Sequence, residues 1–392
     1  MCAMRVILFL VILLILYGLL EYRRHLVAVR SIPIRVHVNG TRGKSSVTRL
    51  IAAGLRGGGV RTVAKTTGTR PRFIFEDGRE EPVVRHGKPN IIEQVKIVRR
   101  ARRHRARALV IECMAVRPEL QLVSERRMVR ATVSVITNAR GDHLDEMGPT
   151  LNDVALALCL TIPKQGIVFT AEKDLLPVIE EQAKRLRAEV RPVADSGVNE
   201  GTLNRFGYVE HPENVALALA VCGYLGVNRD RALEGMVTAR PDPGALRSSR
   251  IIRANKEIEF VNAFAANDAE SVILIWKRLN ISRRVDRPLI TILFNRGDRP
   301  DRAKEFGRLI AHELCADHCI LVGQSTTLVE HVAVGEGLLP RKLINMAGAA
   351  PEAILKKVLE LTPQRSLVVG IGNIVGIGEE IAAHFENRRE AV

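Results

Sequence analysis

Residues 34–50 of this 392-residue chain are Ile-Arg-Val-His-Val-Asn-Gly-Thr-Arg-Gly-Lys-Ser-Ser-Val-Thr-Arg-Leu. A short apolar stretch precedes a turn with glycine at positions 40 and 43, and Lys44-Ser45-Ser46 then opens a helical pattern. Glycine lets the backbone turn its N–H groups inward, and the helix adds the positive end of its dipole. The stretch therefore predicts a nucleotide-phosphate site, in which Lys44 reaches a terminal phosphate and Ser45 binds Mg²⁺.

The spacing of this turn differs from the common Walker A motif. Val38 stands where that motif has its first glycine, so the pattern over Gly40–Ser46 is the shorter G-T-x-G-K-[ST]-[ST]. A glycine turn before an ordinary helix is the alternative interpretation. The strand–turn–helix context favours the phosphate site.

The composition indicates a globular protein with an anionic partner. An apolar fraction of 46% suffices for packed cores, and the length favours two domains. The net charge of +16 suits a nucleic acid, an anionic membrane surface or a polyanionic substrate, and a general preference for Arg over Lys is the alternative explanation for part of it. Aromatic residues make up only 4%, which leaves few platforms for stacking bases, and we expect no nucleic-acid partner.

The N-terminus carries an unbroken apolar run from Val6 to Leu20, followed by Glu21-Tyr-Arg-Arg-His25. The flank lacks the small residues of a signal-peptide cleavage site. Its basic residues favour keeping the following chain on the cytoplasmic side. We expect an uncleaved membrane anchor with its basic flank over residues 1–30, and an interfacial helix is the alternative.

Residues 31–240 are expected to form a parallel α/β domain. Apolar strands are predicted at 34–38, 60–64, 108–112 and 131–137, and Thr150 with Asp153 predicts a capped helix start. Ligands of such sheets gather at the carboxyl ends of the strands. The residues at or just after those ends include Lys44, Glu112, Asn138, Asp142 and His143.

Turn formers at Arg240-Pro-Asp-Pro-Gly244 predict a domain boundary. The remaining residues, 241–392, again alternate strands with helices. The expected fold is α/β: a P-loop parallel-sheet ATPase domain followed by a smaller Rossmann-like domain, with an N-terminal membrane helix.

These motifs resemble a known family. Gly40–Ser46 and Thr137-Asn-Ala-Arg-Gly-Asp-His-Leu-Asp145 are similar to the Mur ligase superfamily, which includes folylpolyglutamate synthase. The strings Lys65-Thr-Thr-Gly-Thr69, Glu112-Cys-Met-Ala115 and Pro241-Asp-Pro-Gly-Ala-Leu-Arg247 more closely resemble the ligase subunits of poly-γ-glutamate synthases, the PgsB/CapB type.

The resemblance implies an ATP-dependent ligase that activates a carboxylate as an acyl phosphate and joins it to an amine. Lys44 and His143 would be catalytic, and Ser45, Glu112 and His143 would hold Mg²⁺. ATP would be bound by Gly40, Thr41, Arg42, Gly43, Lys44, Ser45, Ser46, Asn138, Asn214 and Arg247.

The resemblance also implies where the substrate binds. Thr67 and Thr69 are expected substrate contacts, while Arg296 and Arg299 either neutralise substrate carboxylates or are solvated loop charges. The family's carbamylated lysine has no counterpart, because its place falls near Cys159 and Lys164 is off register. How a second metal would be held is therefore left open.

The expected function is extension of poly-γ-glutamate from glutamate, ATP and Mg²⁺ at the cell membrane, together with other membrane subunits of a synthase. A folate-type polyglutamylating ligase is one alternative, and the apolar N-terminus counts against it. A nucleotide-binding subunit without catalytic activity is another, and the set Lys44, Glu112 and His143 counts against that.

Overall fold

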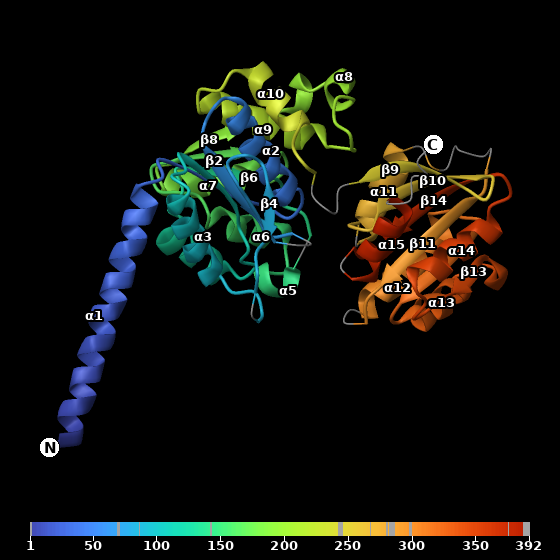
Figure 1. Cartoon of the computed structure of the whole chain (residues 1–392), viewed down its shortest axis with the longest axis horizontal. Coiled ribbons are helices and arrows are strands. Elements are labelled where there is room, and N and C mark those ends of the chain that lie inside the picture. Colours follow the sequence, from blue (N-terminus) through green and yellow to red (C-terminus); the bar gives the residue numbers. More distant parts are fainter. Residues whose placement is uncertain are drawn as a thin grey trace. The chain divides into compact units, whose positions relative to one another are not determined.

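The structure, a computed structural model, describes residues 2–68, 71–85, 87–141, 143–241, 246–266, 268–279, 281, 287–297, 300–374 and 376–386. The chain divides into two compact units (Figure 1). One comprises Met1–Phe206 and Glu210–Asp242, and the other Gly207–Val209 and Pro243–Val392. Each unit has its own sheet and is described by itself.

The first unit is built on an eight-stranded sheet with the order β4-β3-β2-β5-β1-β6-β7-β8. Its strands are β1 Ile34–Asn39, β2 Thr62–Thr66, β3 Arg72–Ile74, β4 Glu80–Pro82, β5 Ala108–Glu112, β6 Val133–Ile136, β7 Ile167–Thr170 and β8 Glu189–Pro192. The expected parallel pairing is confirmed from β2 to β8, whereas at one edge β2–β3 and β3–β4 pair antiparallel. The strand expected at 60–64 lies two residues later, at Thr62–Thr66.

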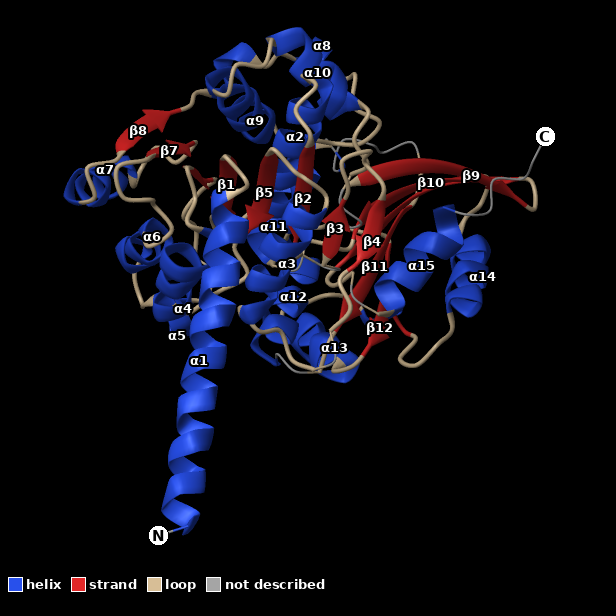
Figure 2. Ribbon diagram, turned by 60° about the vertical axis from the view of Figure 1, so that its left-hand side comes forward, coloured by secondary structure: helices blue, strands red, loops and turns tan. Residues whose placement is uncertain are grey.

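Helices cover both faces of this sheet. They are α2 Lys44–Gly57, α3 Ile92–Arg103, α4 Pro118–Val123, α5 Leu144–Met147, α6 Leu151–Cys159, α7 Leu176–Arg185, α8 Glu200–Leu203, α9 Pro212–Tyr224 and α10 Arg229–Val237, with a π-helix at Ser124–Val129. Figures 1 and 2 show α2, α9 and α10 on one side and α3 and α6 on the other. The predicted capping box is confirmed, since Thr150 and Asp153 exchange hydrogen bonds at the start of α6.

Helix α1 runs without a break from Cys2 to Arg30 and projects from the first unit (Figure 1). Among the described residues it is the one helix long and apolar enough to cross a membrane, judged by length and composition. Its apolar span is exposed, whereas Ala28 and Val29 are buried in the core formed with α3, β2 and β5. His25 Nε2 lies 2.8 Å from the carbonyl oxygen of Met128. The C-terminal end of α1 is therefore part of the packed unit.

The second unit has a six-stranded sheet with the order β13-β12-β11-β14-β10-β9. All neighbouring pairs are parallel except β9–β10. Its strands are β9 Arg247–Arg253, β10 Lys256–Ala263, β11 Leu289–Asn295, β12 His318–Gly323, β13 Leu343–Asn345 and β14 Arg365–Ile371, and its helices are α11 Ala269–Arg278, α12 Pro300–His312, α13 Thr326–Gly335, α14 Pro351–Leu361 and α15 Ile377–Glu386. Separate apolar clusters, one around Trp276 and Phe306 and one around Phe260 and Phe385, form its core.

Candidate active site

The loop between β1 and α2 requires glycine at two positions. Gly40 has φ +135°, and a Cβ atom there would lie 2.0 Å from Thr137 Oγ1. Gly43 has φ +79°, and its Cβ would lie 2.7 Å from Asn214 Oδ1. Because β1 is flanked by β5 and β6, this tight loop lies between the ends of those two strands. Residues that follow β5 and β6 can therefore reach it.

Lys44 lies over the loop that precedes it. Its Nζ donates to the carbonyl oxygens of Gly40 at 2.6 Å and Thr41 at 3.2 Å. Gly43 is the N-cap of α2 and provides no side-chain hydrogen bond, which leaves the first-turn amides able to bind an anion. The Lys44 ammonium and the first-turn amides of α2 thus lie at the same loop, as a phosphate site requires.

Ser45 and Glu112 form the pair that the sequence predicts as metal ligands. Ser45 Oγ donates to Glu112 Oε2 at 2.8 Å, and the amide of Thr67 donates to the same oxygen at 2.6 Å. Val38 and Glu112 are partners in the β1–β5 ladder, so the carboxylate comes to the start of the loop. A hydroxyl beside a carboxylate is a hard-oxygen donor set of the kind that Mg²⁺ prefers.

Asn138 holds the loop in shape. Its Oδ1 accepts hydrogen bonds from Thr41 Oγ1 at 2.7 Å and from the amide of Arg42 at 3.0 Å. Thr137 Oγ1 in turn donates to the carbonyl of Arg42 at 2.6 Å. The residues after β6 therefore fix the loop conformation, and a direct contact of Asn138 with nucleotide stays a prediction.

Glu210 is a site residue that the sequence reasoning missed. It is buried, accepting from Ser46 Oγ at 2.5 Å and from Asn214 Nδ2 at 2.8 Å. The carboxylate therefore joins α2 to the first turn of α9 and orients Asn214 beside Gly43. The available signal was its position four residues before Asn214, in the segment Glu210-His-Pro-Glu-Asn214.

A buried cation lies beside the metal-ligand pair. The Lys65 side chain is fully buried, and its Nζ is 2.7 Å from Glu93 Oε1. Burial lowers the pKa of Lys65, and the attraction of Glu93 and Glu112 opposes that shift. Gln94 Nε2 donates to the carbonyl of Glu112 at 3.0 Å, so the start of α3 is tied to the same strand end. Lys65 was noted in the motif Lys65-Thr-Thr-Gly-Thr69, but its ion pair with Glu93 was not predicted from the sequence.

The remaining predicted residues fall into three groups. His143 is the N-cap of the short helix α5, in a left-handed conformation, and its role at a second metal stays a prediction. Arg247 begins β9 and Arg296 follows β11, both in the second unit. Asp142, Thr69 and Arg299 lie outside the described residues. Within the described ranges, no group of three or more His, Cys, Asp or Glu residues could hold a metal ion.

Two protein-family models match the chain. The Mur ligase middle domain matches residues 38–215, and the poly-gamma-glutamate synthase CapB C-terminal domain matches residues 249–388. A bifunctional folylpolyglutamate synthase/dihydrofolate synthase from Yersinia pestis c092, complexed with AMPPNP and Mn ion, is similar at a TM-score of 0.67 and 14% identity over 93% of this chain and 92% of that chain. The class is thus an α/β protein with the Mur ligase fold.

Two curated relatives narrow that class. The chain is 39% identical over 373 residues to the capsule biosynthesis protein CapB of Bacillus anthracis, covering 94% of this chain and 80% of the relative. It is 38% identical over 368 residues to the PGA synthase CapB of Bacillus subtilis (strain 168), covering 93% of both. The chain belongs to the CapB family of the Mur ligases.

Proposed function

We propose that this chain is an ATP- and Mg²⁺-dependent amide ligase that extends poly-γ-glutamate. The names of the two relatives, one a capsule biosynthesis protein and the other a PGA synthase, support the substrate. The single observation that carries the chemistry is the Ser45–Glu112 pair at 2.8 Å, next to a glycine loop covered by Lys44. A carboxylate and a hydroxyl for a hard cation, beside an ammonium for phosphate, are what phosphoryl transfer needs.

In the proposed reaction, the γ-carboxylate of a chain-end glutamate takes the γ-phosphoryl group of ATP, and ADP leaves. The amine of the next glutamate then attacks the activated carbonyl carbon. Phosphate departs, the amine loses a proton, and one amide bond has formed. The reaction belongs to the acid–amino-acid ligases.

The first unit would supply the charge stabilisation for the phosphoryl transfer. Lys44 and the first-turn amides of α2 hold the phosphates and stabilise the charge that develops on their oxygens. Ser45 and Glu112 would hold Mg²⁺, which would supply positive charge against the phosphates. Glu210 keeps Ser46 and Asn214 in position, with Asn214 proposed to face the nucleoside.

The other assignments come from the family resemblance. His143 is proposed to hold a second Mg²⁺, and Arg247 to face the phosphates. Thr67, Thr69, Arg296 and Arg299 are proposed substrate contacts. Each assignment is tested by its own substitution.

We further propose that α1 anchors the enzyme in the cell membrane, with both units on the cytoplasmic side. The exposed apolar span of α1 and the basic residues after it support this orientation. The glutamate polymer and other membrane subunits of the synthase would be its partners. The overall positive charge suits a polyanionic product and an anionic membrane surface together.

The decisive experiment measures ATP-dependent incorporation of labelled glutamate by membranes that contain the chain and its partner subunits. Lys44→Ala should lower incorporation at least about a hundredfold, because a charge aimed at the transferring phosphoryl group is lost. Lys164→Ala, at an exposed lysine of the same unit, is the matched control. Equal incorporation by the Lys44 variant would show that another subunit performs the chemistry.

Two further arms of this experiment identify the substrate. L- and D-glutamate are supplied separately, and the product is analysed for γ-linkages. A folate with glutamate replaces the polymer acceptor in the second arm. ADP release that rises sharply with folate, and not with glutamate alone, would favour the folate-type ligase.

A further inference from the structure

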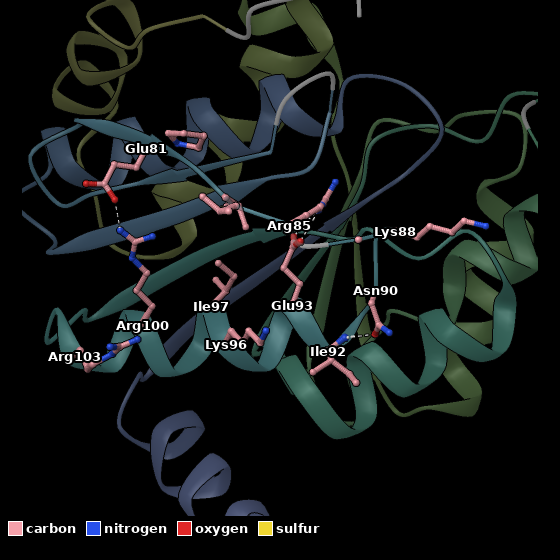
Figure 3. Close-up of a pocket in the computed structure, with 14 residues that line it drawn as sticks. Glu81, Arg85, Lys88, Asn90, Ile92, Glu93, Lys96, Ile97, Arg100 and Arg103 are labelled. Atoms are coloured by element: carbon pink, nitrogen blue, oxygen red, sulfur yellow. Dashed lines mark hydrogen bonds and ion pairs between the residues drawn. The ribbon is translucent and has the colours of Figure 1, made fainter. Parts of the chain in front are cut away.

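A cavity of about 530 Å³ lies along α3 (Figure 3). Its wall is formed by one face of α3 and by the segment that follows β4. The cations that line it are Arg85, Lys88, Lys96, Arg100 and Arg103, against the two carboxylates Glu81 and Glu93. Ile97 provides part of an apolar floor. The cavity is thus a positively charged groove with an apolar floor.

Three of the five cations are available to a ligand. Arg85 donates to Glu93, and Arg100 donates to Glu81 and lies over the ring of Phe73. In the part of the chain that the structure describes, the exposed side chains of Lys88, Lys96 and Arg103 make no ion pair. Both carboxylates are already bound to arginines, so the groove presents an unbalanced positive charge.

One end of the groove is connected to the catalytic edge of the sheet. Glu93, in the first turn of α3, makes the 2.7 Å ion pair with Lys65, and Gln94 donates to the carbonyl of Glu112. From there the helix carries Lys96, Arg100 and Arg103 away from the strand ends, as the labelled side chains in Figure 3 show. The charged face therefore leads away from the proposed site of bond formation.

We propose that this groove binds the growing γ-linked polyglutamate chain behind its reacting end. This inference rests on the proposed function. Lys96, Arg100 and Arg103 stand at i, i+4 and i+7 on one helical face, with rises of about 6 Å and 4.5 Å between them. A γ-linked glutamate has two more backbone carbons than an α-linked residue, so its extended repeat is also about 6 Å. Carboxylates two residues apart, about 12 Å along the oligomer, can thus meet the free cations Lys96 and Arg103, which stand about 10.5 Å apart along the helix axis. Arg100 between them stays paired with Glu81, and the methylene groups of the oligomer pack on the apolar floor.

The test is binding of a fluorescent γ-linked glutamate oligomer to the full chain in neutral detergent, without ATP, followed by anisotropy. Lys96→Gln with Arg103→Gln should weaken binding about tenfold, equivalent to about 1.4 kcal/mol. The matched control is Lys164→Gln with Lys184→Gln, two exposed lysines of the same unit outside the groove. It removes the same charge and should change binding less than about twofold. Equal weakening by both pairs would overturn the groove in favour of a general charge effect.

Two more variants distinguish the loss of groove charge from a folding defect, and oligomer binding from catalysis. Lys96→Arg with Arg103→Lys keeps both charges and should bind the oligomer as the unmodified chain does, which a folding defect could not explain. Lys44→Ala should also bind the oligomer while losing glutamate incorporation. If the Lys96→Gln, Arg103→Gln variant binds the oligomer normally, the groove assignment is wrong and the proposed function still stands. If Lys44→Ala still incorporates glutamate, the proposed function is wrong and the groove assignment still stands.

The competing occupant is an anionic lipid headgroup, because α3 packs against α1. Co-sedimentation with vesicles of neutral phosphatidylcholine, with and without phosphatidylglycerol, distinguishes the two. We expect the groove variant to keep its vesicle binding. Loss of binding to the anionic vesicles alone, with oligomer binding unchanged, would assign the groove to lipid and overturn the polymer assignment.

Discussion

At the scale of single residues, Glu112 carries the most consequential assignment. Its Oε2 accepts from Ser45 Oγ and from the amide of Thr67, which hold the carboxylate at the proposed cation site. Glu112→Gln keeps the size and loses the charge. We expect this variant to need at least about tenfold more Mg²⁺ for half-maximal ATP turnover, since a charged ligand is replaced by a neutral one.

The measurement is ADP release in a Mg²⁺ titration at saturating ATP. Glu119→Gln is the control, because that exposed carboxylate lies in the first turn of α4 and outside the site. An unchanged Mg²⁺ requirement in the Glu112 variant would remove this residue from the metal site. A residue other than Glu112 would then have to hold the cation that acts together with Lys44.

The buried side chain of His37, in strand β1 before the glycine loop, makes the stability of the first unit depend on pH. His37 Nδ1 is 2.9 Å from Glu125 Oε2, with both side chains buried. Burial opposes the charged form, but the interactions with Cys113 and Glu125 outweigh it and raise the pKa of His37 from 6.5 to about 9. Because the folded pKa is the higher one, the stabilisation is complete below pH 6.5 and is lost as pH rises through about 9.

We therefore expect the free energy of unfolding of the first unit to fall by on the order of 3 kcal/mol over this pH range through His37. Urea unfolding followed by circular dichroism at several pH values provides the measurement. His37→Gln should be less stable at pH 6.5 and should show a flatter pH dependence. A variant with the same slope as the original would contradict the assignment.

At the scale of elements, the turn between β1 and α2 requires glycine for two reasons: its positive φ and its close contact with a neighbouring side chain. Gly43 and Gly59 have nearly the same positive φ, +79° and +81°. A Cβ at Gly43 would meet Asn214 at 2.7 Å, whereas a Cβ at Gly59 would meet nothing within 4 Å. The two positions thus form a matched pair within one unit.

Gly59→Ala should cost about 1 kcal/mol, from backbone strain alone. Gly43→Ala should cost at least about 1 kcal/mol more and weaken ATP binding at least about tenfold, because Asn214 and the loop must move. Urea unfolding and binding of a fluorescent ATP analogue measure the two effects. Equal results for both glycines would show that the contact with Asn214 is unimportant.

The elements also show what sequence alone could predict. Local sequence patterns were sufficient to predict the β1–loop–α2 unit, the position of Glu112 at a strand end and the capping box of α6. They were insufficient for the β3–β4 edge, whose strands have three residues each and too little periodicity. Glu210 and the Lys65–Glu93 pair were missed because their partners lie 164 residues and 28 residues away. Such contacts depend on packing, which no local pattern specifies.

At the scale of the whole molecule, α1 has two parts with different environments. Its apolar span is exposed, and Glu21 near the end of that span pairs with Arg99 at 3.1 Å. From His25 onward the helix is packed in the first unit, with Ala28 and Val29 in the core. A truncation after residue 24 should therefore separate anchoring from folding.

We expect the full chain to stay with membranes in high salt, and the chain lacking residues 1–24 to become soluble with its urea midpoint nearly unchanged. Among the described residues, this truncation removes the exposed Glu21–Arg99 ion pair and the hydrogen bond from Arg99 to the carbonyl oxygen of Glu21. Exposed ion pairs contribute about 0–1 kcal/mol. Removal of residues 1–30 should instead destabilise the unit by several kcal/mol, because buried Ala28 and Val29 are deleted. Membrane fractionation and urea unfolding distinguish the two truncations. Release of the full chain by salt alone would mean that electrostatic attraction of the basic surface, rather than insertion of α1, holds the protein at the membrane.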